Sequence, residues 1–157
     1  MTIATFTLAA MLSLAPGRDH TVLASAIAAR VDTEAPLFAD DADKRKTSAW
    51  LVAIAFRESS LKLDAVGDHG QSYCAFQIHR TSGGSATMLT DANACVSAAF
   101  RMLRTSMHVC PAFPLAWYAH GGASTTACAS GRAQRISRDR LNLSKWLVAH
   151  VVTKEDS

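Results

Sequence analysis

The stretch that decides the fold reads TSAWLVAIAFRESSL at residues 47–61 and AVGDHGQSYCAFQI at residues 65–78. In the first segment, Trp50, Ile54 and Glu58 recur every four residues, which places them in one stripe of an α-helix. The second segment opens with turn-forming glycine and aspartate residues and continues with residues typical of a short β-strand. Together the segments predict a helix that ends beside a tight loop and a small β-hairpin.

Glu58 lies on the face of this helix that otherwise carries apolar residues. A carboxyl group in such a place either pairs with a cation or has a raised pKa. Arg57 is a poor partner, because adjacent residues on a helix point about 100° apart. A partly buried carboxyl that stays protonated near neutral pH is what glycoside cleavage requires of its general acid. The alternative is a solvent-exposed glutamate at a frayed helix end.

The segment after the helix supplies a second candidate residue. Residues 67–72 are small or turn-forming, so they predict a tight loop. If residues 73–78 form a strand, alternation places Gln77 on the face opposite Cys74 and Phe76. An amide both donates and accepts hydrogen bonds, which suits the acetamido or hydroxyl group of a sugar. An ordinary polar strand residue is the alternative interpretation of Gln77.

The rest of the chain is dominated by helical periodicity, without a repeat or linker that would divide it. Its 157 residues fit a single domain, which we place at residues 1–157. Residues 2–15 are apolar and uncharged and are interpreted as a first helix, with a degenerate secretion signal as the alternative. The predicted fold class is therefore mainly α with one small β-hairpin. Further helices are expected at residues 19–31, 40–60, 91–103, 115–120 and 133–151, with Asp19, Asp40 and Asp91 as caps of the first three.

The four cysteines are Cys74, Cys95, Cys110 and Cys128, and they have neither CxxC nor zinc-finger spacing. An even number without metal-ligand spacing favours two disulfides, and therefore an oxidising compartment. Four buried free thiols are the alternative. Of the three possible connectivities we favour Cys74–Cys95 together with Cys110–Cys128, the second of which would close a loop of about 18 residues.

The composition, 49% hydrophobic and 18% charged, is that of a globular chain. No apolar run reaches the ~20 residues that span a membrane. Arg132, Arg135 and Arg138 recur every three residues and predict a basic helix face, which we interpret as solvated, so no nucleic-acid partner is expected. The six histidines lack metal-ligand spacing, and neither a phosphate-binding loop nor a serine-hydrolase motif occurs, so no metal or other cofactor is expected.

The order of the motifs resembles that of the soluble lytic transglycosylase (SLT) domains, which share the lysozyme-like fold with goose-type lysozyme. The family pattern is Glu-Ser on a helix, then Gly-x-x-Gly-x-Ser, then Gly-Leu-Met-Gln, then Ala-Tyr-Asn-x-Gly. The matched segments run from about residue 47 to 122, over half of the chain. They are Glu58-Ser59, Gly67-Asp68-His69-Gly70-Gln71-Ser72, Phe76-Gln77 and Trp117-Tyr118-Ala119-His120-Gly121.

The resemblance implies a lysozyme-like fold with a hairpin beside the active-site cleft, and a role for each matched position. Glu58 would be the catalytic acid/base, with Ser59 following it at the cleft. Ser72 would face the cleft from the loop, and Gln77 would contact the substrate. Tyr118 would donate a hydrogen bond to the catalytic carboxyl.

The chain also departs from the family pattern. Residues 74–76 read Cys-Ala-Phe where the family has Gly-Leu-Met. Ala119 stands in place of the asparagine, whose substrate contact His120 would have to supply. Trp117 replaces an alanine and would stack on a sugar face. These changes affect the expected substrate contacts rather than the expected fold.

The activity that the resemblance implies is cleavage of the β-1,4 bond between N-acetylmuramic acid and N-acetylglucosamine, with closure of a 1,6-anhydro ring. A goose-type hydrolase would use a second carboxyl ~5–9.5 Å from the first. Asp64, Asp68 and Asp91 are the candidates, although turn and cap roles are the preferred interpretation of all three. A wall-binding module without turnover is the third alternative. We expect a monomer that acts on peptidoglycan glycan strands in the periplasm or outside the cell, or that a phage or secretion apparatus delivers to the wall.

Overall fold

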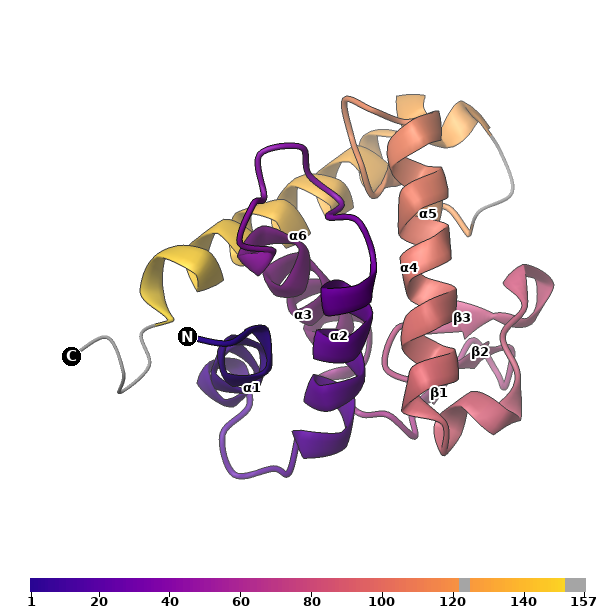
Figure 1. Ribbon diagram of the computed structural model, residues 1–157. Coiled ribbons are helices and arrows are strands. Elements are labelled where there is room, and N and C mark those ends of the chain that lie inside the picture. Colours follow the sequence, from indigo (N-terminus) through magenta and orange to yellow (C-terminus); the bar gives the residue numbers. More distant parts are fainter. Residues whose placement is uncertain (122–124, 152–157) are drawn as a thin grey trace.

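The computed structural model describes residues 1–121 and 125–151, and this part of the chain is mainly helical with a small antiparallel sheet (Figure 1). This confirms the predicted fold class of a mainly α chain with a small β element. The α-helices are α1 (Ile3–Leu14), α2 (Thr21–Thr33), α3 (Arg45–Ser59), α4 (Ala92–Val109), α5 (Ala116–Ala119) and α6 (Gly131–His150). The strands are β1 (Val66–Gly67), β2 (Ser72–Tyr73) and β3 (Ile78–His79), and the 3-10 helices are η1 (Arg80–Ser82), η2 (Ala86–Leu89) and η3 (Thr125–Ala129).

Helix α3 is the centre of the core, and it packs against α1, α2 and α6. Every residue from Thr47 to Ala55 is buried, and Trp50 and Ile54 are fully inaccessible to solvent. A helix that is apolar on nearly all sides lies inside a domain rather than at its surface. The apolar run that predicted the helix therefore also explains its central position.

Helix α1 is present as predicted and contributes to this core. The side chain of Thr2 accepts a hydrogen bond from the backbone amide of Thr5 and so caps the helix. Phe6 and Met11 are buried in this core. The hydroxyl groups of Thr7 and Ser48 lie 2.7 Å apart, and this hydrogen bond joins α1 to α3.

The start of α3 differs from the prediction that Asp40 begins it. Helix α3 starts at Arg45, after Lys44 in a left-handed conformation, and its first amides donate to the carboxylates of Asp43, at 3.1 Å from Arg45, and of Asp41. The two oxygens of Asp41 accept hydrogen bonds from the amides of Lys46 (2.9 Å) and Thr47 (2.7 Å). Asp41 is buried, whereas Asp40 forms an exposed ion pair with Lys46. Both carboxylates fit a helix start by sequence, and only the packing of the preceding loop selects Asp41.

The prediction that residues 73–78 form one strand is wrong. The chain forms two short strands, β2 and β3, with a tight turn between them in which Cys74 and Gln77 adopt positive φ angles of 64° and 50°. The sheet has the order β1-β2-β3, all antiparallel, with Tyr73 opposite both Val66 and Ile78. Because the turn folds inward, Cys74, Ala75 and Phe76 are all buried, so the expected alternation of faces is absent.

The two favoured disulfides are confirmed. Cys74–Cys95 ties the turn of the sheet to α4, and Cys110–Cys128 ties the residue after α4 to η3. Figure 1 shows the sheet lying beside α4, on the opposite side of the molecule from α1. Disulfides are typical of proteins that fold in an oxidising compartment.

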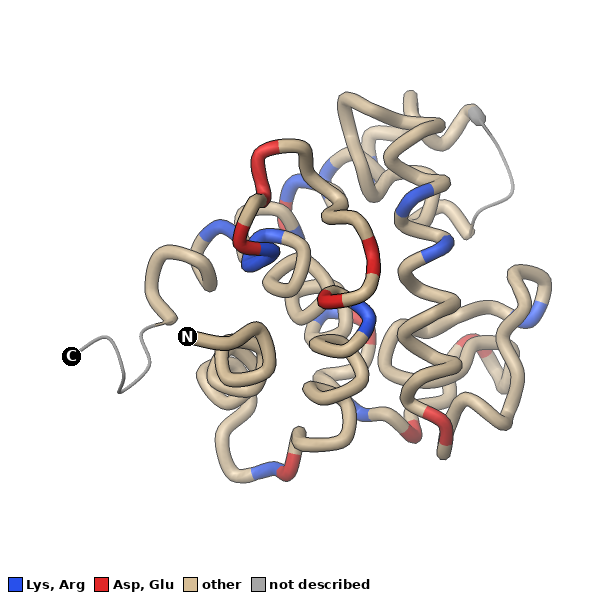
Figure 2. Tube along the Cα trace, viewed as in Figure 1, with Lys and Arg blue, Asp and Glu red and all other residues tan. Residues whose placement is uncertain are grey.

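Charged residues are spread unevenly over this fold. Figure 2 shows acidic residues gathered in the loop between α2 and α3, and basic residues along α4 and α6. In the described ranges, 1–121 and 125–151, no helix is both long and apolar enough to cross a membrane.

Candidate active site

Two surface hollows meet at the C-terminal end of α3, and Glu58 and Gln77 line both of them. The hollow on the side of α5 and α6 has a volume of about 310 Å³, and the one on the side of β1 about 790 Å³. We call the two together the Glu58 cleft. The first is lined by Glu58, Asp68, Ser72, Gln77, His79, Tyr118, Ala119, Gly121, Arg132, Ile136 and Arg140. The second is lined by Arg18, Glu58, Ser59, Lys62, Asp64, Ala65, Val66, Gly67 and Gln77.

The position of Glu58 follows from the way α3 ends. The amide of Ser60 donates the last helical hydrogen bond, to the carbonyl of Phe56 at 2.8 Å, and the left-handed conformation of Ser60, with a φ of 56°, then stops the helix. The hydroxyl of Ser59 lies 2.8 Å from the carbonyl oxygen of Ala75 and 3.0 Å from that of Ala55. Ser59 therefore joins the helix end to the turn of the sheet. Its hydroxyl is engaged by the backbone, and its predicted contact with substrate stays a prediction.

The Glu58 carboxylate lies beside a cation from the far end of the chain. Arg140 Nη2 is 3.4 Å from Glu58 Oε1, and the Glu58 side chain is 25% exposed. Burial raises the pKa of Glu58 above its ordinary value of 4.5; the guanidinium of Arg140 opposes this, and the charge of Asp68 adds to it. The net result is a carboxyl that is harder to ionise than usual, as the apolar stripe of α3 predicts.

Arg140 is the residue that sequence reasoning missed. It lies 82 residues from Glu58, so no local pattern connects the two. A weak signal exists on α6, because Arg132, Ile136 and Arg140 recur every four residues and all three line the cleft. Arg57 points away from Glu58, as predicted, and forms an ion pair with Asp139 at 3.0 Å.

Tyr118 lies at the cleft, but its hydrogen bond differs from the one that the resemblance implied. Its buried hydroxyl donates to the backbone carbonyl of Phe76 instead of to Glu58. Burial, followed by the charge of Glu58, raises the pKa of the Tyr118 phenol well above its ordinary value. Tyr118 is thus close enough for the charge of Glu58 to affect its pKa. Its hydroxyl is hydrogen-bonded to the turn that contains Gln77.

Ser72 and Gln77 both line the cleft, as predicted. Ser72 is buried and donates a hydrogen bond to Asp68. Gln77 Nε2 donates to the carbonyl of Cys74 at 2.9 Å, and a β-carbon placed on Gly67 would lie only 2.0 Å from Gln77 Oε1. Glycine at position 67 is therefore what leaves room for the amide oxygen of Gln77.

Trp117 and His120 are placed differently. Within the described part of the chain, neither of them lines the Glu58 cleft. Trp117 packs on a small cluster of buried residues that includes Cys110, Ala116 and Ala133. His120 is the residue after α5, between the lining residues Ala119 and Gly121. We predicted that His120 replaces an asparagine contact with the substrate and that Trp117 stacks on a sugar. Neither residue lies where the cleft, as defined by its lining residues, would support that prediction.

The three candidate second carboxylates are separated by the fold. Asp68 shares the smaller hollow with Glu58 and raises the pKa of that residue through its charge. Asp64 lines the larger hollow. Asp91 caps α4, where its side chain accepts a hydrogen bond from the amide of Ala94, as the preferred interpretation expects.

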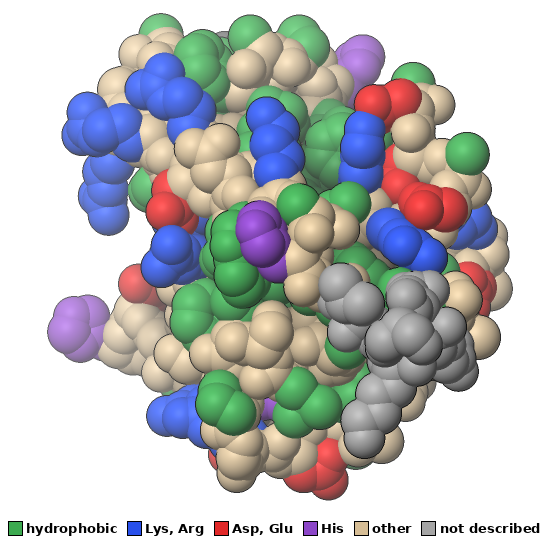
Figure 3. All heavy atoms as spheres, turned by 90° about the vertical axis from the view of Figure 1, so that its left-hand side faces the viewer, with side chains coloured by type: hydrophobic (Ala, Val, Ile, Leu, Met, Phe, Trp, Pro, Cys, Tyr) green, Lys and Arg blue, Asp and Glu red, His purple; other side chains and the backbone are tan. Residues whose placement is uncertain are grey.

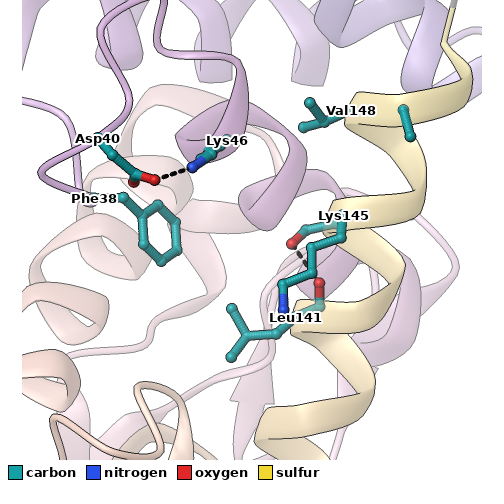
Figure 4. Close-up of a pocket in the computed structure, with 8 residues that line it drawn as sticks. Phe38, Asp40, Lys46, Leu141, Lys145 and Val148 are labelled. Carbon is teal, nitrogen blue, oxygen red and sulfur yellow. Dashed lines mark hydrogen bonds and ion pairs between the residues drawn. The ribbon is translucent and has the colours of Figure 1, made fainter.

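A third hollow of about 370 Å³ lies between α6 and the loop before α3 and is mostly apolar (Figure 4). Its carboxylate, Asp40, is paired with Lys46, so it offers no free acid. Figure 3 shows hydrophobic side chains interspersed with basic ones on the face that includes α1 and the end of α6. Among the described residues, no group of three or more His, Cys, Asp or Glu side chains could hold a metal ion. The Glu58 cleft is thus the better candidate for acid/base chemistry.

Comparison with protein-family profiles, with curated proteins and with solved structures finds no match to this chain.

Proposed function

We propose that this protein cleaves the glycan strands of peptidoglycan as a lytic transglycosylase. The observation that carries the proposal is a single, largely buried carboxyl with a raised pKa at the junction of two hollows. A glycan that crosses the cleft from one hollow to the other would place a glycosidic bond beside Glu58. The motif order that resembles the SLT domains supports the same conclusion.

Glu58 would act twice in this reaction. As an acid it gives its proton to the glycosidic oxygen, and the bond from that oxygen to C1 of N-acetylmuramic acid breaks. As a carboxylate it then takes the proton of the C6 hydroxyl, whose oxygen bonds to C1 and closes the 1,6-anhydro ring. Glu58 ends in the protonated state in which it began, and no water is consumed. The Gln77 amide, which faces the same cleft, would position the sugar through its oxygen.

A goose-type hydrolase is the second candidate, and Asp68 is the observation in its favour. Asp68 lines the same hollow as Glu58, so water activated there would attack C1. However, the Asp68 carboxylate already accepts a hydrogen bond from Ser72, and a positive φ of 49° places it in the turn between β1 and β2. This structural role favours the transglycosylase over the hydrolase.

The test is release of soluble fragments from purified peptidoglycan by the wild type, Glu58→Gln and Asp68→Asn. We expect the wild type to release 1,6-anhydro products, Glu58→Gln to lose activity at least 100-fold, as is usual for removal of a general acid (about 10²–10⁴-fold), and Asp68→Asn to retain the product type. Mass spectrometry separates anhydro from reducing-end products. Reducing-end products that disappear in Asp68→Asn would identify a hydrolase. Saturable wall binding without fragments would identify a binding module.

The proposed setting follows from the same function. The two disulfides fit a protein that works in the periplasm or outside the cell, or that a phage or secretion apparatus delivers to the wall. The proposed partner is the peptidoglycan glycan strand, bound by a monomer without a cofactor. The basic residues on α6 would favour an anionic polymer such as the cell wall.

A further inference from the structure

Four charged side chains connect α3 to α6 at the edge of the Glu58 cleft, and we call them the α3–α6 charge cluster. On α3 they are the adjacent Arg57 and Glu58, and on α6 the adjacent Asp139 and Arg140. Arg57 Nε is 3.0 Å from Asp139 Oδ2, which is also 3.0 Å from Arg140 Nη1. Arg140 Nη2 then reaches Glu58 Oε1 at 3.4 Å. The order Arg57, Asp139, Arg140, Glu58 alternates in sign from one end to the other.

In this arrangement Asp139 and Glu58 compete for one cation, Arg140. Arg140 lies between the two carboxylates, so its positive charge is shared between them. Asp139 also interacts with Arg57, which leaves part of the charge of Arg140 available to Glu58. Asp139 is therefore a competitor of Glu58 for the charge of Arg140.

Other titratable groups surround Glu58, but Arg140 is the nearest opposite charge in the described residues. The loop between β1 and β2 contributes Asp68, β3 contributes His79, and α5 contributes Tyr118. The remaining lining groups that carry charge are Arg132 on α6, and Arg18, Lys62 and Asp64 around the larger hollow. Within the described ranges, Arg140 alone lies within ion-pair distance of Glu58.

Stability does not explain the placement of Arg140. Its side chain is only 16% exposed, and its Nε is buried without a hydrogen-bond partner among the described residues. Burial of a guanidinium group with an unsatisfied donor costs stability, and an ion pair with a partly buried carboxylate recovers little of that cost. Residues that break a packing rule in this way concentrate at functional sites.

We propose that Arg140 is a positioning residue that keeps Glu58 able to change protonation state within one reaction cycle, with Asp139 moderating its charge. This inference rests on the proposed function, in which Glu58 acts first as an acid and then as a base. Burial alone disfavours the carboxylate form that the second role requires. Arg140 stabilises the carboxylate after the first proton transfer, while the competition from Asp139 prevents Glu58 from ionising before it.

The test is the pKa of Glu58, measured by carbon NMR titration of the carboxyl group in the full chain without substrate, with Glu58→Gln identifying the resonance. Arg140→Gln should raise this pKa by about one unit, because it removes the opposite charge. Asp139→Asn should lower it by a smaller amount, because it removes the competitor for Arg140. Arg135→Gln, which removes the same charge from the exposed face of α6, should leave it unchanged. Shifts of the same sign in Arg140→Gln and Asp139→Asn, or no shift in either, would overturn the inference.

A second readout uses the pH dependence of kcat/KM for release of peptidoglycan fragments. The alkaline limb reports loss of the acid form of Glu58, so it should move up in Arg140→Gln and down in Asp139→Asn. The value of kcat should fall in Arg140→Gln, and Arg140→Lys, which keeps the charge, should restore most of it. An unmoved alkaline limb in both variants contradicts the inference. Because the NMR titration needs no turnover, its result stands even if fragment release shows that the proposed function is wrong.

Discussion

Glu58 is surrounded by groups that act on its carboxyl in opposite directions. The apolar environment of α3 and the charge of Asp68 raise the pKa, and Arg140 lowers it. The order of these causes matters, because burial is the largest and the net pKa lies above the ordinary value. A glutamate with a purely structural role would destabilise the fold less if it were fully paired with a cation or fully exposed to solvent. The observed balance supports the proposed role of Glu58, in which it is first an acid and then a base.

This balance predicts a pH-dependent effect of Glu58→Gln on stability. Because the folded state raises the pKa, the folded chain holds the proton more tightly than the unfolded chain, so stability falls as the pH rises above 4.5 through the folded pKa. The neutral variant avoids this loss. We expect Glu58→Gln to melt a few degrees above the wild type at pH 7 and at the same temperature near pH 3.5. Thermal unfolding followed by circular dichroism measures the difference, and a constant offset at all pH values would contradict the prediction.

Among the elements, the small sheet depends on a turn that L-residues seldom adopt. Cys74 and Gln77 have positive φ angles, and the turn is held by the Cys74–Cys95 disulfide and by the hydrogen bond of Tyr118 to Phe76. Positions with such strain persist where surrounding contacts enforce them, and they concentrate at functional sites. Here the strain turns the Gln77 side chain toward Gly67 and the cleft.

Two glycine substitutions near this sheet should separate activity from stability. In Gly67→Ala the new β-carbon would meet the end of the flexible Gln77 side chain, 2.0 Å from Oε1. We expect Gln77 to be displaced, with activity lowered about 10- to 100-fold and nearly unchanged stability.

In Gly84→Ala the β-carbon would lie 2.0 Å from the backbone oxygen of Ile78, so a loss of about 1–3 kcal/mol of stability is expected. Urea unfolding and fragment release measure both, and a large stability loss in Gly67→Ala would count against this account.

At the level of the whole molecule, the cleft is built from segments far apart in the chain. Helix α3 supplies Glu58, the sheet supplies Gln77, and α6 supplies Arg140, with α6 packed directly on α3. The two disulfides cross-link segments beside this helix pair. One joins the turn of the sheet to α4, and the other joins the end of α4 to η3, just before α6. Cross-links of this kind stabilise mainly by limiting the unfolded chain.

The two disulfides should differ in their response to reductant. Cys74 and Cys95 are fully buried, whereas Cys128 is half-buried. We expect dithiothreitol to reduce Cys110–Cys128 first in the folded protein and Cys74–Cys95 only on unfolding, as followed by alkylation and mass spectrometry. The double substitution Cys110→Ser with Cys128→Ser should lower the free energy of unfolding by about 3 kcal/mol. Equal reduction rates of the two disulfides without denaturant would contradict the expectation.

The sequence by itself determined the features that depend on neighbouring residues. The periodicity of Trp50, Ile54 and Glu58 was enough to place Glu58 on the apolar side of α3, and the glycine-rich loop predicted the turn before β2. The cysteine pairing that we favoured is the one observed, although the sequence allowed three connectivities. The resemblance to SLT domains stays a prediction, since neither a family profile nor a curated protein nor a solved structure matched the chain.

Only the tertiary structure decided the partners of these residues. The pairing of Glu58 with Arg140 joins positions 82 residues apart, and it exists because α6 packs on α3. The hydroxyl of Tyr118 donates to the carbonyl of Phe76 instead of to Glu58, and this contact joins residues 42 positions apart in the chain. Local periodicity is set by each helix alone, whereas ion pairs and hydrogen bonds between elements are set by how those elements dock. The sequence therefore located Glu58 as the candidate acid, and the packing of α6 on α3 placed Arg140 beside it.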